Sequence, residues 1–160
     1  FGRKLNPKAI CFHNSLRKRY NEIFMNNSAR SKFITVPRYR CDKNSQSMKV
    51  YIALPVIACR TNCAYDIANG ELFNVTSFTK NHIIIKDKDS NTRKIDINDF
   101  TKLFYPAYCI TAHKSQGATF DRPYTILEWS KMSDRMKYVS ISRATNKNLI
   151  NIIDDAGGLV

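Results

Sequence analysis

The stretch Ile110-Thr111-Ala112-His113-Lys114-Ser115-Gln116-Gly117-Ala118-Thr119-Phe120-Asp121 decides the fold of this 160-residue chain. A hydrophobic strand leads into it and ends in a loop of hydroxyl, imidazole, ammonium and amide side chains. In open α/β sheets, ligands bind beside the carboxyl ends of the strands. Lys114 adds positive charge to such a loop, and Gly117 permits close approach of the backbone to phosphate oxygens. The alternative is a helix N-terminus capped by Thr111 or Ser115.

A second stretch, Tyr138-Val139-Ser140-Ile141-Ser142-Arg143-Ala144-Thr145, follows about twenty residues later. It places Arg143 directly after an apolar helix and before the last strand. An arginine at the end of an element can point across a domain cleft, where its planar guanidinium suits a transferring phosphoryl group. Taken alone, Arg143 is better explained as a surface residue or as a charge that favours a helix C-terminus.

The surrounding sequence alternates strand and helix patterns and predicts an α/β domain with a parallel sheet. Between them, the Asn69-Gly70 turn and short alternating runs indicate a small antiparallel insertion. Strands are predicted over 8–12, 33–36, 55–59, 72–78, 81–86, 92–97, 105–111, 124–127 and 149–153, helices from 14 or 15 to about 25 and over 133–142, and a loop over 38–49. The predicted domain boundaries are 1–49, 50–100 for the insertion, and 101–160.

The charge of the chain points to a polyanionic partner. Lys and Arg number 26 against 13 acidic residues, which gives a net charge of +13 and a pI near 9.7. The basic residues are spread along the chain, as on a folded basic surface, with one dense patch at Arg17-Lys18-Arg19. Nucleic acid is therefore favoured over a membrane, since no run reaches the ~20 apolar residues of a membrane span. The alternative is a solvated face that happens to be rich in lysine.

Two further classes of site are not expected. The five cysteines are an odd number without paired metal-ligand spacing, so no metal site is predicted. No glycine lies in a G-x-x-x-x-G-K-[ST] loop, the backbone cradle that holds the β- and γ-phosphates of ATP. The chain alone is therefore not expected to hydrolyse ATP.

Together, the two stretches closely resemble motifs V and VI of superfamily 1 DNA helicases. The similarity is to the RecD and Pif-like branch, subclass B, where the motifs read approximately H-K-S-Q-G-x-T-[FLY]-D and Y-V-A-[LF]-S-R-A. Residues 10–21 resemble the strand and helix after motif IV, with His13-Asn14 where the family usually has Thr-Asn. Residues 54–62 and 69–72 resemble the start of the family's SH3-like subdomain. The resemblance is strongest over 108–146 and weakest over 38–49.

The resemblance implies the second RecA-like domain of a helicase, with a small SH3-like β-barrel insertion. It implies that Arg143 is an arginine finger for ATP hydrolysis and that Gln116 and Gly117 lie on the nucleotide side, coupling the DNA grip to the cleft. The residues implied to contact the DNA backbone are Thr111, His113, Lys114 and Ser115. ATP with Mg²⁺ would be held mainly by the first RecA-like domain. Single-stranded DNA and that domain are the implied partners, and 5′→3′ is the implied direction of movement.

Several expectations concern the context of the chain. Because motifs I to III are not in the sequence, we expect a fragment of a larger helicase or a split protein. The abundance of Asn, Ile and Lys is typical of AT-rich genomes such as those of large DNA viruses. An intracellular location is expected, in the host cytoplasm or nucleus if the protein is viral.

Two other functions compete with the helicase domain. A stand-alone nucleic-acid-binding module that keeps the fold without motor activity would be equally basic. An RNA-directed superfamily 1 helicase is also possible, although the His-Lys-Ser-Gln-Gly form favours the DNA branch. The helicase hypothesis makes one geometric prediction: the Arg143 guanidinium and the loop around Lys114 line adjoining edges of one sheet, and neither is buried in the core.

Overall fold

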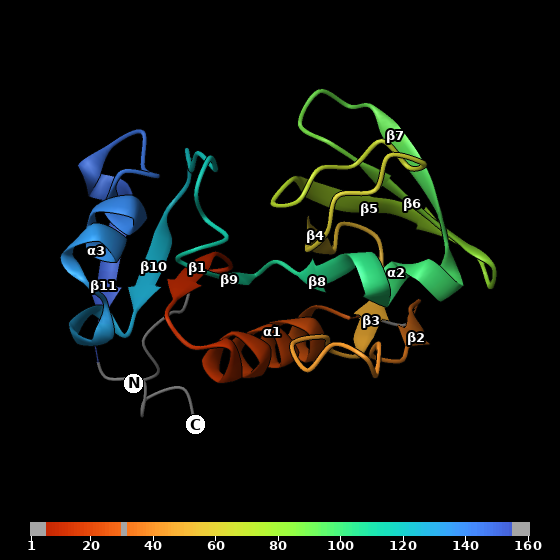
Figure 1. Cartoon of the computed structure of the whole chain (residues 1–160), viewed down its shortest axis with the longest axis horizontal. Helices are drawn as coiled ribbons and strands as arrows, with labels where there is room; N and C mark the ends of the chain where they lie inside the picture. The colour runs from red at the N-terminus through yellow and green to blue at the C-terminus, as the bar shows by residue number, and fades with distance from the viewer. Residues whose placement is uncertain (1–5, 30–31, 155–160) are drawn as a thin grey trace. The chain divides into compact units, whose positions relative to one another are not determined.

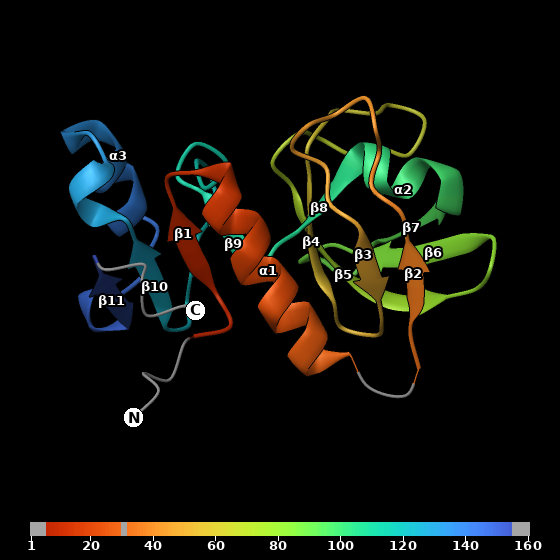
Figure 2. The same cartoon turned by 90° about the horizontal axis from the view of Figure 1, so that it is seen from below.

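The computed structural model describes residues 6–29 and 32–154 and divides the chain into two compact units. The parallel-sheet unit consists of the residues up to Asn21 and those from Tyr108 onward, and the β unit is Glu22–Ala107. Both units are seen in Figures 1 and 2. The division predicted from the sequence, with boundaries after 49 and 100, differs from this one and stays a prediction.

The parallel-sheet unit is built on four parallel strands in the order β11-β10-β1-β9. The strands are β1 (Ala9–Cys11), β9 (Cys109–Thr111), β10 (Tyr124–Leu127) and β11 (Ile150–Ile153). All residues of β1, β9 and β10 are buried, as expected for a parallel sheet covered on both faces. Because the four strands are parallel, their carboxyl ends lie at the same end of the sheet, which is where ligand-binding loops are expected.

Helices complete this unit. They are α3 (Asp134–Ile141), the short 3-10 turns η1 (Trp129–Lys131) and η2 (Lys147–Leu149), and the part of α1 (Asn14–Ser28) up to Asn21. The Ser133 hydroxyl caps α3 by accepting a hydrogen bond from the Met136 N–H. The buried Asn21 of α1 binds the backbone of Cys109 twice, with its amide nitrogen 3.0 Å from the Cys109 carbonyl oxygen and its amide oxygen 2.7 Å from the Cys109 nitrogen. Asn21 thus pairs with the free edge of β9 as a neighbouring strand would.

The β unit contains a five-stranded antiparallel sheet in the order β7-β6-β5-β4-β8 and a two-stranded sheet β2-β3. The strands are β2 (Ile34–Val36), β3 (Met48–Val50), β4 (Pro55–Ala58), β5 (Leu72–Phe78), β6 (His82–Lys86), β7 (Thr92–Asp96) and β8 (Phe104–Pro106), and one helix, α2 (Ile97–Leu103), joins β7 to β8. Figure 2 shows β2 and β3 side by side. Phe73, Phe100 and Phe104 pack against one another in the core of this unit.

The expected fold class, a parallel sheet with an antiparallel β insertion, is confirmed. Three local predictions were incomplete. The strand predicted over 105–111 is two strands, β8 and β9, which belong to different sheets. The loop predicted over 38–49 ends in β3, and α2 was not predicted. Over the described residues, no helix is both long and apolar enough to cross a membrane.

Candidate functional site

The loop 112–118 begins at the carboxyl end of β9 and is held together by two buried hydroxyl groups. The Ser115 hydroxyl donates to the Ala112 carbonyl over 2.7 Å, and the Lys114 N–H donates to the Thr111 hydroxyl over 3.4 Å. Ser115 is fully buried and Thr111 is 7% exposed. These two hydroxyls therefore shape the loop from the inside and are not on its surface.

The surface of this loop carries the other side chains of the sequence motif. His113 and Gln116 are exposed, and Lys114 is partly exposed. Gly117 has a φ of 84°, a conformation that only glycine adopts without strain, and a Cβ built there would meet no atom within 4 Å. The loop thus presents an imidazole, an amide and an ammonium group beside an open stretch of backbone.

Arg143, just after α3, is anchored to the same loop. Its Nη1 lies 3.3 Å from the Ala118 carbonyl oxygen and 3.5 Å from that of Ser115. Its Nε donates to the Val139 carbonyl over 3.0 Å, and its Nη2 to the Ser142 hydroxyl over 3.1 Å. All four acceptors are neutral, and no carboxylate of the described residues forms an ion pair with the guanidinium. Its orientation is fixed while its positive charge stays available to an anion.

The backbone reinforces this contact. The Phe120 N–H donates to the Arg143 carbonyl over 2.8 Å, and the Thr145 N–H donates to the Phe120 carbonyl over 3.0 Å. The residues predicted from the two motifs are therefore brought together on one unit, and neither Arg143 nor Lys114 is buried in the core. The guanidinium and the loop are in direct contact, which is closer than the adjoining edges that were predicted. The roles of the individual residues stay predictions.

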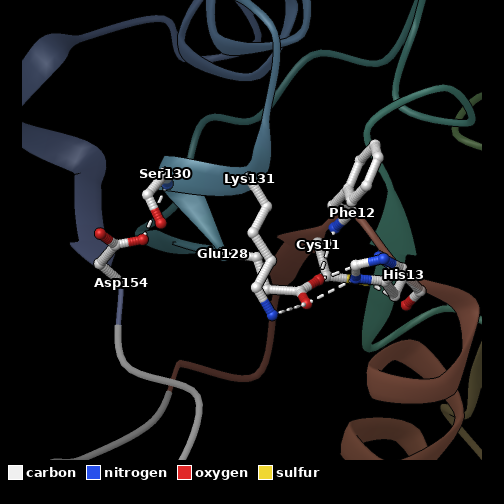
Figure 3. A network of polar contacts seen from close by, with 7 residues as sticks. All are labelled: Cys11, Phe12, His13, Glu128, Ser130, Lys131 and Asp154. Carbon is white, nitrogen blue, oxygen red and sulfur yellow. Dashed lines mark hydrogen bonds and ion pairs between the residues drawn. The ribbon is translucent and has the colours of Figure 1, made fainter.

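A carboxylate that the sequence analysis did not single out organises the neighbouring loops (Figure 3). Glu128 follows β10 in a left-handed conformation with a φ of 56°, and only 3% of it is exposed. Its Oε2 accepts the N–H groups of Phe12 and His13 over 3.0 and 2.9 Å. Its Oε1 lies 2.8 Å from His13 Nδ1 and 3.4 Å from Lys131 Nζ. Glu128 thereby fastens the end of β10 to the start of α1.

Electrostatics favour the ionised form of Glu128. Burial alone raises its pKa, but the hydrogen bonds from His13 and Phe12 outweigh burial and hold the pKa below its ordinary value. In Figure 3, the Asp154 carboxylate makes a similar contact at the end of β11, where it accepts the Ser130 N–H over 2.8 Å. Glu128 could have been noticed as a carboxylate directly after a buried strand, but Phe12 and His13, which donate to it, lie more than a hundred residues away in sequence.

Among residues 6–29 and 32–154, no group of three or more His, Cys, Asp and Glu side chains could hold a metal ion. The carboxylate of Glu128 is instead occupied by protein donors.

Comparison with solved structures identifies the fold. The chain is similar to Bacteroides Pif1 bound to single-stranded DNA, with a TM-score of 0.70 and 18% identity over 96% of this chain. It is also similar to Bacteroides Pif1 in complex with ADP-AlF3 and single-stranded DNA (TM-score 0.66, 19% identity, 96% of this chain). Candida albicans Pif1 gives a TM-score of 0.68 at 15% identity over 99% of this chain.

The chain spans 42% of the length of the Bacteroides proteins and 48% of that of the Candida protein. No family model matches the sequence, and no curated protein matches it either. The structural similarity confirms the expected fold: a RecA-like parallel-sheet domain with a β insertion, as in part of a Pif1 helicase.

Proposed function

We propose that this chain is the second RecA-like domain of a superfamily 1 DNA helicase of the RecD and Pif-like branch. In this role it grips single-stranded DNA and supplies Arg143 as the arginine finger for ATP hydrolysis on a partner RecA-like domain. The shared fold supports the proposal, as does the crystallisation of similar proteins with single-stranded DNA and ADP-AlF3. The net charge of +13 supports a polyanionic partner.

The observation that carries the proposal is the setting of the Arg143 guanidinium. It is held in place by neutral oxygen atoms and is not neutralised by a carboxylate of the described residues. A preorganised positive charge of this kind stabilises negative charge that develops during phosphoryl transfer. Its contact with the loop 112–118 also links the group proposed to face nucleotide with the loop proposed to face DNA.

The residues of the loop take different parts in the proposed DNA contact. His113 and Lys114 reach solvent and are the groups that would meet phosphate oxygens. Thr111 and Ser115 have hydroxyls engaged inside the loop, so we assign them the positioning of that loop. Gln116 and Gly117 lie between these residues and the Arg143 anchor at Ala118, which suits the proposed coupling to the nucleotide.

The nucleotide in this proposal is ATP with Mg²⁺, whose phosphoanhydride hydrolysis supplies the free energy for movement. This sequence has no phosphate-binding loop, so most of the nucleotide contacts would come from the first RecA-like domain. The exposed Nη2 side of Arg143 and the open backbone at Gly117 fit a contribution from this chain. Movement in the 5′→3′ direction is part of the proposal and rests on the resemblance of the motifs.

The test is reconstitution. We expect the chain, mixed with a polypeptide that carries helicase motifs I to III of the same protein, to give ATP hydrolysis that single-stranded DNA stimulates. Binding of DNA without stimulated hydrolysis would instead favour the stand-alone nucleic-acid-binding module. Stimulation by RNA and not by DNA would favour the RNA-directed alternative.

Lys114→Ala is expected to weaken the binding of all DNA sequences alike and to make the dependence of log K on log salt shallower by about 1. The reason is that loss of one phosphate contact removes the release of about one counterion. Fluorescence anisotropy over a series of salt concentrations measures both effects. Lys147→Ala, which removes an exposed lysine from η2 of the same unit, is the matched control. An unchanged salt slope for Lys114→Ala would count against a phosphate contact.

A further inference from the structure

A cavity of about 210 Å³ lies in the parallel-sheet unit between the loop 112–118 and α3 with its cap. Its polar side chains are His113, Gln116, Ser133 and Arg135, and Met136 and Val139 form its apolar wall. Two of these residues belong to the loop proposed to contact DNA. The other four belong to α3 or its cap, and no role was predicted for them.

Three of the polar side chains are available to a ligand. His113, Gln116 and Arg135 are exposed, and none of the three makes a side-chain hydrogen bond or ion pair with another residue in the described part of the chain. The Ser133 hydroxyl differs, because it caps α3 through the Met136 N–H. These three side chains converge on one cavity that also has apolar walls, and apolar walls with a few convergent polar groups are the usual form of a ligand-binding site.

The size and chemistry of the cavity select the ligand. Pockets for whole drug-sized ligands measure about 300–1,000 Å³, so a cavity of about 210 Å³ suits a single planar ring system better than a complete ATP molecule. An imidazole and two apolar side chains can pack on the face of a nucleobase, and a glutamine amide can hydrogen-bond its edge. A guanidinium at the rim suits the adjacent phosphate.

We propose that this cavity takes one nucleobase of a bound DNA strand, with Arg135 contacting the neighbouring phosphate. In this arrangement His113, Met136 and Val139 pack on the base and Gln116 hydrogen-bonds its edge. The inference rests on the proposed DNA-binding function and adds that this domain holds a base as well as the backbone. It also assigns a contact to Arg135, which lies outside both sequence motifs.

The experiment compares the binding of two DNA strands of equal length to the 160-residue chain. One is a fluorescent oligothymidylate, and the other is the same backbone with abasic sites throughout. Base stacking on proteins is sequence-tolerant, and we expect the base-containing strand to bind about 5- to 100-fold more tightly. Anisotropy titrations at several salt concentrations give the affinities and the salt slopes.

Variants assign the effects to the cavity. Val139→Phe fills it and is expected to remove most of the preference for bases while leaving binding of the abasic strand unchanged. His113→Ala with Gln116→Ala removes exposed side chains, so it tests the same preference if Val139→Phe unfolds. Arg135→Ala is expected to weaken the binding of both strands and to make the dependence of log K on log salt shallower by about 1. Arg122→Ala, an exposed arginine of the same unit outside the cavity, is the matched control.

The outcomes separate the two proposals. Equal affinity of the wild-type chain for both strands, or an undiminished preference in the folded cavity variants, would overturn the base site and leave DNA binding intact. Failure of the wild-type chain to bind either strand would overturn the proposed function together with this inference. Displacement of the base-containing strand by ATP that depends on Arg135 would show a mononucleotide site and would also overturn the proposal.

Discussion

Replacement of Arg143 by alanine is expected to lower the DNA-stimulated ATPase rate of the reconstituted helicase by a factor of about 10³ or more. The guanidinium is fixed by four hydrogen bonds to neutral acceptors, so its charge is oriented before any phosphate arrives. Preorganised groups of this kind act on the transition state more than on the bound substrate. DNA affinity should therefore change little, because no DNA contact is assigned to Arg143.

Two controls make this result interpretable. Arg143→Lys keeps a positive charge but loses the planar donor geometry, and we expect it to restore only a small part of the rate. Arg122→Ala should leave the rate unchanged. Thermal unfolding should accompany each assay, because the lost contacts to Ser115 and Ala118 also loosen the loop. Near-normal turnover of folded Arg143→Ala would refute the arginine finger.

Glu128→Ala is expected to lower the free energy of unfolding by about 3 kcal/mol, because it leaves the Phe12 and His13 N–H groups without their acceptor at about 1–3 kcal/mol each. Urea unfolding measures the difference directly. Glu22→Ala, which removes an exposed carboxylate from α1, is the control and should change stability far less. A loss below about 0.5 kcal/mol for Glu128→Ala would show that water replaces the carboxylate without cost.

The same carboxylate gives a defined pH dependence. The pKa of Glu128 is lower in the folded protein than its ordinary value, because hydrogen bonds from His13 and Phe12 outweigh the effect of burial. Its ionised form therefore stabilises the fold above the unfolded pKa of about 4.3, and this contribution is lost as the pH falls through the lower, folded pKa. Glu128→Gln should make acid unfolding below about pH 4.3 less steep than in the wild type.

The sequence was sufficient for those parts of the fold that local pattern determines. The predicted strand 124–127 coincides with β10, and the apolar spacing of the helix after His13 gave α1. The break between β8 and β9 was not predicted, because the two residues that form it, Ala107 and Tyr108, are buried and hydrophobic like the strands they separate. A continuous apolar run does not reveal where a chain leaves one sheet for another. The seven-residue helix α2 is too short to show a helical period.

The candidate site was predicted only as far as the two motifs reach. They identified Arg143 and the loop around Lys114, but residue types do not show which way a hydroxyl points. The inward orientation of Thr111 and Ser115 therefore emerged only from the structure. Glu128 was missed because the N–H groups that it binds, those of Phe12 and His13, come from the other end of the chain. Arg135 lay in a predicted helix, where a charged residue is usually just solvated.

The oxygen atoms of Ser115 and Ala118 that hold Arg143 belong to the main chain, and every amino acid supplies the same carbonyl group. Substitutions of Ala118 that preserve the backbone conformation of the loop would leave this contact with Arg143 intact. A saturation mutagenesis library selected for unwinding should therefore accept many replacements of Ala118 and reject nearly all of Arg143. The side chain at position 118 can therefore change during evolution while the guanidinium of Arg143 keeps its orientation.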